Sequence, residues 1–390
     1  MDDFGAWLRD RACIAGVGET AYSRESGRSP DSLAVEACLH ALRDAGIEPS
    51  EVDGLISYPG AVPVESVIGA LGLTNITFAT TVHMGGASMV AALGVAAVAV
   101  ASGATRHVML YVARNGSSET RIGDRVHAFA PTRFQSELEV PFGWTTPAQW
   151  YAMICQRHMH KYGTSTGQLA SVAVQMRANA QLNPKAMMYG RPLSLDDYMK
   201  SEFIAEPYRK LDCCLETDGG AALLVTSAPG AASRSNPTVY IASVASAFPD
   251  SPDDLVNRSD WFECGLSKAA PRAFRMAQAT PQDMDLALIY DCFTFELIHQ
   301  LEEGGFCPRG QGGKFVEDGN IGLKGSLPVN PHGGMLSEAH MAGVNHVIEA
   351  VRQLRGQCEE RQVTGASSAA VTGWGSFGNG AIAILRSQPR

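Results

Sequence analysis

Residues 87–101 constrain the fold more than any other part of this chain, because the helix that they predict has almost no polar face. They run Ala-Ser-Met-Val-Ala-Ala-Leu-Gly-Val-Ala-Ala-Val-Ala-Val-Ala, in which Ser88 is the one polar side chain. A helix that is apolar all round has to be covered on both sides. The longest apolar stretch, Met89 to Ala101, is too short and too rich in alanine to span a membrane. We therefore predict that this helix is buried inside the protein.

Strands and helices alternate around this segment. Arg11–Val17 and Val52–Ser57 predict strands, and Ser29–Ser32 begins a helix that runs to about Ala45. His107–Ala113 is typical of a strand that is buried on both faces, as in a parallel sheet. This alternation predicts an α/β layered fold with right-handed crossovers.

Residues 115–210 interrupt the alternation. They are rich in Arg, Gln, Met, Tyr and Pro, and they predict helices such as Thr166–Asn183 but few strands. We interpret this region as a cap inserted over the first unit. The first unit resumes with a tight turn and an apolar strand at Asp218–Thr226.

A second unit begins near Pro237 and repeats the order of the first. Its predicted elements are the strand Val239–Ser243, the helix Gly265–Gln278, the strand Asp285–Tyr290, the helix Phe293–Gly304 and the closing strands Ala369–Gly373 and Ala381–Leu385. The repeated order suggests an internal duplication. We predict an N-terminal half at 1–236, with its cap insertion at about 115–210, and a C-terminal half at 237–390.

The composition limits the partners and the compartment. The net charge of −9 over 390 residues argues against nucleic acid as the main partner, because phosphate binding needs clustered Lys and Arg. The nine cysteines are scattered without a CxxC pair, which suits free thiols in a reducing cytoplasm. His158-Met159-His160 is too isolated to predict a metal site. The acidic start Met1-Asp2-Asp3-Phe4 is unlike a signal peptide, so we expect a cytoplasmic protein without a membrane segment.

The segment Asn330–Gly343 carries the strongest signal for chemistry. A glycine pair at 333–334 precedes His340, and apolar residues at three- and four-residue steps predict a helix over 344–354. A helix N-terminus exposes backbone N–H groups and the positive end of a dipole. An imidazole held there can transfer a proton or polarise an oxyanion. The alternative is a buried structural histidine in a tight loop.

Two glycine-rich segments could supply backbone N–H groups to an anion. His83–Ser88 leads into the apolar helix, and Gly86 lies where the helix N-terminus could hold an oxyanion. Residues 372–381 combine four glycines, Gly375 among them, with two aromatic residues in a compact loop between strands. The alternatives are close packing of the central helix for the first segment and a structural hairpin for the second.

Ile289–Thr294 lies where a predicted strand ends and a helix begins. Tyr290, Asp291 and Cys292 therefore lie at the carboxyl edge of the sheet, where α/β proteins place their sites. Tyr290 offers a phenol and Asp291 a helix cap. Cys292 has no basic neighbour in sequence, so nothing marks it as an activated thiolate, and we favour buried packing for it.

Together these segments resemble the thiolase superfamily over nearly the whole chain. Within it, the chain is most similar to the sterol-carrier-protein type of thiolase and to the lipid-transfer aldolases of bacterial steroid side-chain degradation. The family has an Asp-Gly-Ala-Ala turn, a His-Asp-Cys-Phe or Asn-Glu-Ala-Phe segment and an Asn-x-x-Gly-Gly segment that precedes a Gly-His-Pro. The matching residues here are Asp218–Ala222, Tyr290–Phe293, and Asn330–Gly334 with His340, and Phe306–Pro308 with Gly310–Gly312 matches the sterol-carrier branch.

The departures from the family pattern direct the prediction of function. Aligning the central helix through Ser102-Gly103 places Gly86 where working thiolases have their nucleophilic cysteine, and 372–380 lacks the family's second cysteine. The Gly-His-Pro becomes Ala339-His340-Met341, and the His or Asn of the third motif becomes Tyr290. Covalent acyl transfer should fail without the nucleophile. The steroid side-chain retro-aldolases also lack these cysteines and carry a tyrosine at the position of Tyr290.

The resemblance implies a thiolase-like α/β fold, in which two duplicated βαβαβ-type halves form a five-layer αβαβα core with an inserted cap. It implies retro-aldol cleavage of a β-hydroxyacyl-CoA, such as a 17-hydroxy steroid side-chain CoA ester, to a ketone and propionyl-CoA or acetyl-CoA. CoA would enter as part of the substrate, and no separate cofactor or metal is expected. We predict Tyr290 and His340 as the proton-transfer pair, with the choice of base left open, and Gly86, Gly375, Asp291 and His332 as oxyanion or substrate-binding groups.

The resemblance also implies partners. We expect a homodimer of this chain and a small OB-fold, zinc-ribbon protein that together form a two-plus-two complex. Two other functions stay open from the sequence. One is a thiolase or acyltransferase that uses another cysteine, such as Cys292, and the other is a non-catalytic subunit that binds acyl-CoA.

Overall fold

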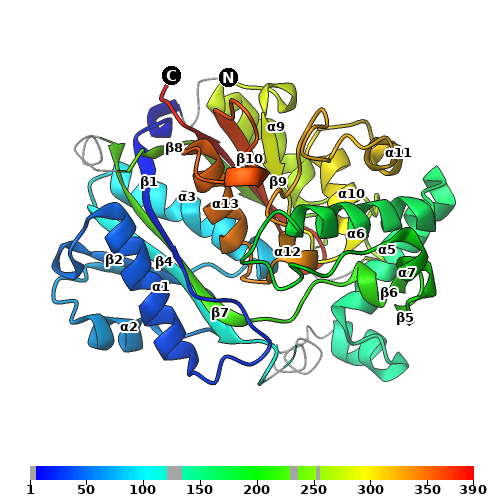
Figure 1. The fold of residues 1–390 in the computed structure, drawn as a ribbon, viewed down its shortest axis with the longest axis horizontal. Coiled ribbons are helices and arrows are strands. Elements are labelled where there is room, and N and C mark those ends of the chain that lie inside the picture. The colour runs from blue at the N-terminus through cyan, green and yellow to red at the C-terminus, as the bar shows by residue number, and fades with distance from the viewer. Residues whose placement is uncertain (1–5, 120, 122–133, 229–235, 252–254) are drawn as a thin grey trace.

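One mixed sheet runs through the computed structural model, which describes residues 6–119, 121, 134–228, 236–251 and 255–390 (Figure 1). Its nine strands follow the order β3-β2-β4-β7-β1-β8-β11-β10-β9. The strands are β1 (Ala12–Glu19), β2 (Gly54–Ser57), β3 (Phe78–Thr81), β4 (His107–Asn115), β7 (Asp218–Ser227), β8 (Val239–Ala247), β9 (Leu286–Leu288), β10 (Ser368–Gly375) and β11 (Asn379–Arg386).

The sheet repeats one pairing pattern on each side of its centre. In the first half β2 is parallel to β4, β4 is antiparallel to β7, and β7 is antiparallel to β1. In the second half β9 is parallel to β10, β10 is antiparallel to β11, and β11 is antiparallel to β8. The halves meet where Cys13 and Ile14 of β1 pair with Tyr240 and Val239 of β8. The predicted duplication is therefore present in the strand order, while the boundaries 1–236 and 237–390 stay a prediction.

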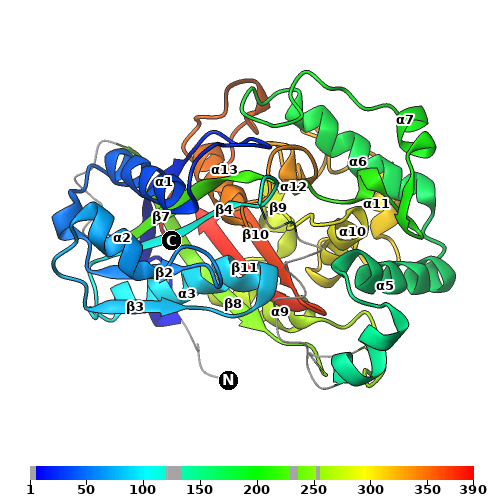
Figure 2. The same ribbon diagram turned by 90° about the horizontal axis from the view of Figure 1, so that it is seen from below.

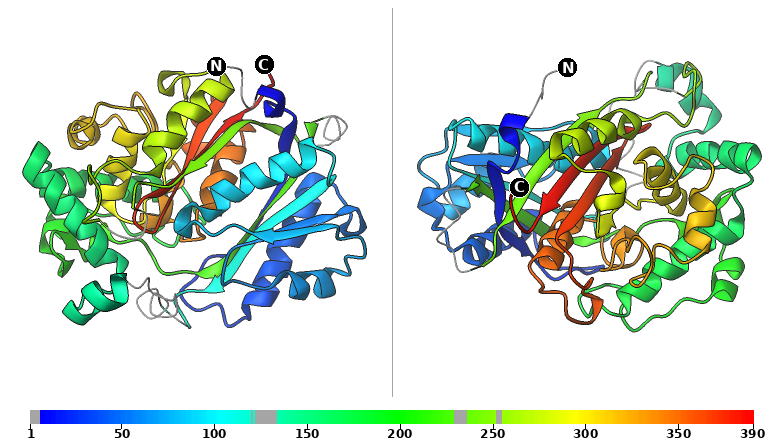
Figure 3. Two further views of the ribbon diagram at one scale, coloured as in Figure 1. Left: turned by 180° about the vertical axis from the view of Figure 1, so that it is seen from behind. Right: turned by 90° about the horizontal axis from the view of Figure 1, so that it is seen from above.

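Helices form three layers around the two halves of the sheet. α1 (Pro30–Ala45) covers the outer face of the first half, and α9 (Gly265–Ala277) covers the outer face of the second half (Figure 3). α3 (Ser88–Ala101) and α13 (Val344–Leu354) contact each other and strands of both halves, so they form the middle layer. The layers follow the order αβαβα, and the fold is the predicted α/β, thiolase-like one.

The burial of α3 explains its composition. Its contacts with strands of both halves leave little room for a polar face, and most of its residues are buried. Gly94 and Ala101 are half-buried, and Val95 and Val98 are exposed, with 36% and 43% of their surface accessible. None of the helices in the described part of the chain combines the length and apolarity that crossing a membrane requires.

The inserted region covers a different part of the molecule from the one predicted. Its helices are α5 (Pro147–Tyr162), α6 (Thr166–Ala180) and α7 (Leu195–Lys200), followed by the small hairpin of β5 (Phe203–Ala205) and β6 (Tyr208–Arg209). The other helices are α2 (Val64–Leu71), α10 (Thr294–Glu303), α11 (Gly312–Glu317) and α12 (Gly334–Ser337).

α6 contacts α10, α11 and α12, so the described part of the cap lies against the second half and not over the first unit (Figure 2). The physical reason is apolar packing. Met176, Tyr198 and Tyr208 of the insertion share one hydrophobic core with Phe295 of α10. Residues 120 and 122–133 of the predicted cap lie outside the described part.

Candidate active site

Tyr290 and His340, the predicted proton-transfer pair, lie in contact. Tyr290 follows β9, and His340 lies in the turn between α12 and α13. The Tyr290 Oη lies 3.1 Å from the His340 Nε2, and the two rings meet edge-on with centroids 6.1 Å apart. Tyr290 is 4% exposed and His340 is half-buried. A phenol and an imidazole at hydrogen-bond distance can exchange a proton.

The two predicted glycines lie beside this pair. Gly86 is in the short turn Gly85–Ala87 that leads into α3, and Gly375 ends β10. A Cβ atom built on Gly86 would lie well under 3.0 Å from the Tyr290 Oη and from the Trp374 carbonyl oxygen. The Tyr290 hydroxyl therefore occupies the space that a side chain at position 86 would need.

Gly375 is as tightly enclosed as Gly86. A Cβ atom on Gly375 would lie under 3.0 Å from the Met84 carbonyl oxygen and from the Gly86 nitrogen. The backbones of the two glycines consequently touch next to Tyr290. The segment 372–381 is the hairpin of β10 and β11, as the structural alternative for this segment stated. The same hairpin also places Gly375 against Gly86.

Three neighbours hold His340 in place. The Thr217 Oγ1 accepts a hydrogen bond from the His340 backbone N–H at 3.1 Å, and the Arg114 Nη2 donates to the His340 carbonyl oxygen at 2.7 Å. The Cys214 Sγ lies 3.5 Å from the His340 Nδ1. The imidazole is thus contacted at both ring nitrogens, by Cys214 at Nδ1 and by Tyr290 at Nε2.

Tyr290 is fixed by backbone hydrogen bonds from buried side chains. Its N–H donates to the Thr372 Oγ1 at 3.2 Å, and its carbonyl oxygen accepts from the Gln300 Nε2 at 2.7 Å. Burial, together with nearby Tyr58, raises the pKa of Tyr290 well above its usual value, and Arg114 opposes this shift. The phenol is therefore protonated at neutral pH.

Arg114 and Tyr58 belong to the surroundings of the pair, although the sequence interpretation missed them. The Arg114 guanidinium lies 5.9 Å from the centre of the Tyr58 ring, and both residues are half-buried. Arg114 is near the carboxyl end of β4, and Tyr58 directly follows β2. The rule that picked out Tyr290, the carboxyl edge of the sheet, applies to both of them.

Asp291 joins the end of the Tyr290 strand to α12 and to His346. Its carboxylate is fully buried and accepts hydrogen bonds from the backbone N–H groups of Met335 at 2.8 Å and Leu336 at 3.3 Å. The His346 Nε2 lies 3.1 Å from the Asp291 Oδ1. These contacts hold the start of α12. The helix that follows Asp291 in the sequence is α10, whose N-cap is Phe293, so Asp291 caps a different helix from the one predicted. Asp291 therefore supports the site, and its predicted role in substrate binding stays a prediction.

His332 is also part of the support. It is fully buried, with its ring centre 4.9 Å from that of His346, whose ring lies 6.4 Å from that of Tyr290. Its Nε2 lies 3.6 Å from the Glu338 Oε2. Burial lowers the pKa of His332 well below its usual value, so the ring is neutral. His346 lies between His332 and Tyr290, and the predicted role of His332 in substrate binding stays a prediction.

None of the cysteines near the pair is prepared to act as a nucleophile. Burial, with the Glu296 and Cys214 neighbours, raises the pKa of Cys292 well above that of an ordinary thiol. Burial also raises the pKa of Cys214 to about 12. Thiolates, not thiols, are the nucleophiles, so both sulfurs are inert at neutral pH. Among the described residues, no three His, Cys, Asp or Glu side chains are grouped as a metal ion would require.

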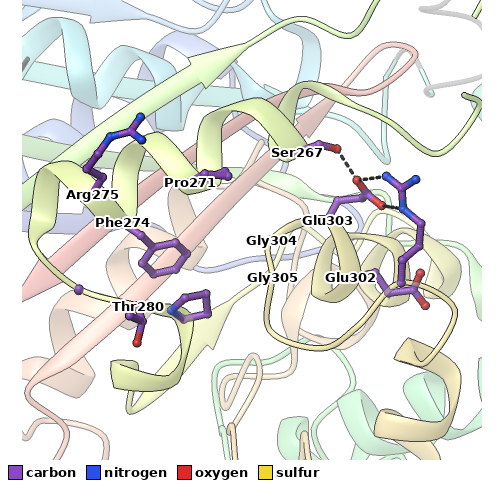
Figure 4. Close-up of a pocket in the computed structure, with 12 residues that line it drawn as sticks. Ser267, Pro271, Phe274, Arg275, Thr280, Glu302, Glu303, Gly304 and Gly305 are labelled. Atoms are coloured by element: carbon purple, nitrogen blue, oxygen red, sulfur yellow. Dashed lines mark hydrogen bonds and ion pairs between the residues drawn. The ribbon is translucent and has the colours of Figure 1, made fainter. Parts of the chain in front are cut away.

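A separate cavity of about 540 Å³ lies between α9 and α10 (Figure 4). Phe274, Arg275 and Thr280 line it, together with Glu303, whose carboxylate accepts hydrogen bonds from the Arg309 guanidinium. The cavity shares no lining residue with the Tyr290–His340 pair. It lies between helices of the second half.

Known proteins show similarity over most of the chain. Residues 251–387 match the family described as Thiolase C-terminal domain-like. The 17-hydroxy-3-oxo-4-pregnene-20-carboxyl-CoA lyase of Mycobacterium tuberculosis is 39% identical over 90% of this chain and 92% of its own length. A steroid side-chain-cleaving aldolase of Thermomonospora curvata is 40% identical over 90% of this chain and 91% of its own.

A solved structure gives the same result in three dimensions. The Ltp2-ChsH2(DUF35) aldolase superimposes with a TM-score of 0.89 and 36% identity, over 97% of this chain and 98% of that chain. The repeated strand order, the middle-layer helices and these similarities agree with one another. The chain therefore belongs to the thiolase superfamily, in the branch that contains steroid side-chain-cleaving aldolases.

Proposed function

We propose that this chain is an aldolase that breaks the Cα–Cβ bond of a β-hydroxyacyl-CoA by a retro-aldol reaction. The substrate is a 17-hydroxy steroid side-chain CoA ester, and the products are a 17-ketone and a short acyl-CoA, propionyl-CoA or acetyl-CoA. One observation carries the proposal. The Tyr290 hydroxyl fills the space next to Gly86, where an acyl-transfer enzyme of this family would need its nucleophile, and it contacts His340. The names of the two curated relatives support the substrate class.

The pair can move the protons that this reaction needs. The β-hydroxyl proton has to leave while the electrons of the Cα–Cβ bond move into the thioester as an enolate, and the α-carbon then takes a proton. Burial keeps Tyr290 protonated, so the phenol alone is no base. With the His340 Nε2 at 3.1 Å, Tyr290 can pass its own proton to the imidazole while it accepts the substrate proton. The reverse path returns one proton to the α-carbon, so the protons balance.

The enolate needs positive charge or hydrogen-bond donors beside its oxygen. Gly86 lies in the turn that leads into α3, where backbone N–H groups and the helix dipole favour an anion. The backbone of Gly375 touches this turn. The Arg114 guanidinium, which is close enough to influence the pKa of Tyr290, adds a cation. We propose that the enolate oxygen binds beside Gly86, between the start of α3 and Arg114.

The two other functions have less support. A thiolase that uses Cys292 would need a thiolate, and burial raises the pKa of that thiol. A purely binding subunit would not need a phenol and an imidazole in contact with each other. Retro-aldol cleavage uses both groups and needs no thiolate, so we favour it.

We also propose that the working enzyme is an assembly in the cytoplasm. The solved relative whose name pairs Ltp2 with ChsH2(DUF35) supports a small OB-fold, zinc-ribbon partner for this chain. Dimerisation is supported by β3, which pairs with β2 at the edge of the sheet in the described part of the chain, and by the exposed Val95 and Val98 of α3. We propose two copies of each chain. The free, mostly buried cysteines agree with a reducing compartment.

The experiment uses the chain co-purified with its small partner. The complex is incubated with a 17-hydroxy steroid side-chain CoA ester in the absence of free CoA, and the products are quantified by mass spectrometry. Retro-aldol cleavage yields ketone and short acyl-CoA in equal amounts without added CoA. A parallel incubation supplies a β-ketoacyl-CoA together with free CoA, because a thiolase needs a β-carbonyl for CoA to attack. Formation of two acyl-CoA products there, with no cleavage of the hydroxy ester, would identify a thiolase instead. Tight binding of the ester without any turnover would identify a binding subunit.

A further inference from the structure

Cys214 is held beside His340 by its own backbone. It lies in the segment that joins the insertion to β7, and its N–H donates to the Cys292 carbonyl oxygen at 2.9 Å. The next residue, Leu215, donates to the Met335 carbonyl oxygen at 3.0 Å. These two bonds fix the segment between the strand end that carries Tyr290 and α12. The Cys214 Sγ consequently lies 3.5 Å from the His340 Nδ1.

The neighbouring cysteine points elsewhere. The Cys213 Sγ lies 3.6 Å from the Arg209 carbonyl oxygen, and both cysteines are half-buried. Both residues are therefore half-buried cysteines, but their sulfur atoms contact different partners. Of these two cysteines, Cys214 is the one whose sulfur contacts the imidazole of the proposed proton-transfer pair.

The chemistry of Cys214 limits what it can do. Burial and the Asp291 charge raise its pKa to about 12, while Arg114 acts in the opposite direction, so the group is a neutral thiol. A thiol sulfur is a weak hydrogen-bond acceptor and its S–H is a weak donor. It can still decide between two tautomers of an imidazole, because these differ only in which ring nitrogen carries the proton.

The proton path through Tyr290 requires one of these tautomers. Tyr290 can pass its proton to the His340 Nε2 only when that nitrogen has a free lone pair. The ring proton then has to be on Nδ1, which faces the Cys214 Sγ. We propose that Cys214 is a positioning residue that accepts the Nδ1–H of His340, and so keeps Nε2 available to Tyr290. This inference rests on the proposed function for its role in turnover, but the tautomer itself belongs to the resting protein.

The kinetic test compares Cys214→Ala, Cys214→Ser and the matched control Cys213→Ala in the complex. Cys214→Ala should lower kcat about tenfold, equivalent to about 1.4 kcal/mol of transition-state stabilisation, with little change in KM. The serine hydroxyl can accept the same hydrogen bond, so Cys214→Ser should recover most of kcat. Cys213→Ala should behave like the wild type. A wild-type kcat in Cys214→Ala, or a serine variant as slow as the alanine variant, would overturn the assignment.

A spectroscopic test needs no turnover and separates this inference from the proposed function. The chain is labelled with 15N-histidine, and the resonances of His340 are identified by their loss in His340→Ala. The wild type should show a protonated Nδ1 and an unprotonated Nε2, and Cys214→Ala should shift both signals towards a mixture of tautomers. A wild-type ring protonated at Nε2, or the same tautomer with and without the Cys214 thiol, contradicts the inference. If the tautomer is as stated and the complex cleaves no substrate, the proposed function fails alone.

Discussion

Replacing Gly86 with alanine should destabilise this chain much more than a glycine-to-alanine change normally does. The added Cβ would lie well under 3.0 Å from the Tyr290 Oη and from the Trp374 carbonyl oxygen. The tyrosine ring can move, but Trp374 is paired with Gly380 within the β10–β11 hairpin, so its carbonyl group cannot retreat without breaking the ladder. Overpacking of a core costs about 1–3 kcal/mol, and a clash with backbone belongs at the upper end, so we expect a loss of about 3 kcal/mol.

The part of this loss that comes from Tyr290 can be isolated with a double variant. Tyr290→Ala removes the ring, so Gly86→Ala should cost less in that background, with a coupling of about 1 kcal/mol. Gly69 supplies the matched control, because a Cβ on this glycine of α2 meets nothing within 4 Å. Gly69→Ala should leave stability unchanged or raise it by up to about 1 kcal/mol, since alanine is the better helix former.

The assay is urea unfolding followed by circular dichroism, with the free energy of unfolding taken from the midpoint and the slope. Two results would contradict this reasoning. One is a Gly86→Ala variant as stable as Gly69→Ala. The other is a double variant whose loss of stability equals the sum of the losses of Gly86→Ala and Tyr290→Ala, which would show that the Tyr290 hydroxyl does not fill the space at position 86. The same clash predicts that Gly86→Cys alone does not create a thiolase, because the new sulfur has no room beside Tyr290.

Three further outcomes follow from buried groups. Burial raises the pKa of Glu296 to about 8 from its usual value of 4.5. The folded chain therefore holds this proton up to a higher pH than the unfolded chain does. The free energy of unfolding consequently falls as the pH rises between these two values. Glu296→Gln should flatten that fall in urea titrations at several pH values, and an unchanged slope would contradict the shift. Asp291→Ala should cost about 3 kcal/mol or more, since it leaves buried N–H groups of α12 and His346 without their acceptor, and a thermal midpoint equal to that of the wild type would rule this out. Iodoacetamide should leave Cys214 and Cys292 unmodified in the native chain at neutral pH, and rapid alkylation detected by peptide mass spectrometry would show an activated thiolate.

The architecture followed from sequence patterns that depend on local periodicity. The apolar segment at 87–101 required cover on both sides, and α3 has it, because strands from both halves pack on the helix. The repeated order of strands and helices predicted the duplication that the pairing pattern contains. The position of the cap was wrong, because apolar residues such as Met176 and Tyr198 indicate burial without indicating which core buries them.

The sequence predicted those site residues that belong to recognisable motifs, such as Tyr290 at the end of a strand. Tyr290 and His340 were chosen from motifs, and the structure brings them within 3.1 Å of each other. Arg114 satisfied the same rule but had no motif to draw attention to it. Cys214 had no signal at all, since its place beside His340 depends on backbone bonds to distant residues such as Cys292 and Met335.

The most direct test of the central claim is the single-turnover cleavage of the β-hydroxyacyl-CoA by the wild-type complex and by Tyr290→Phe and His340→Ala. Tyr111→Phe is the matched control, because it also removes a buried tyrosine hydroxyl, which donates to the Val62 carbonyl oxygen at 3.1 Å on the far side of β4. Loss of a proton-transfer group should lower the rate by at least about 10²-fold in both site variants, while Tyr111→Phe keeps the wild-type rate. Folded Tyr290→Phe or His340→Ala complexes that cleave the ester at the wild-type rate would show that the pair does not perform the reaction.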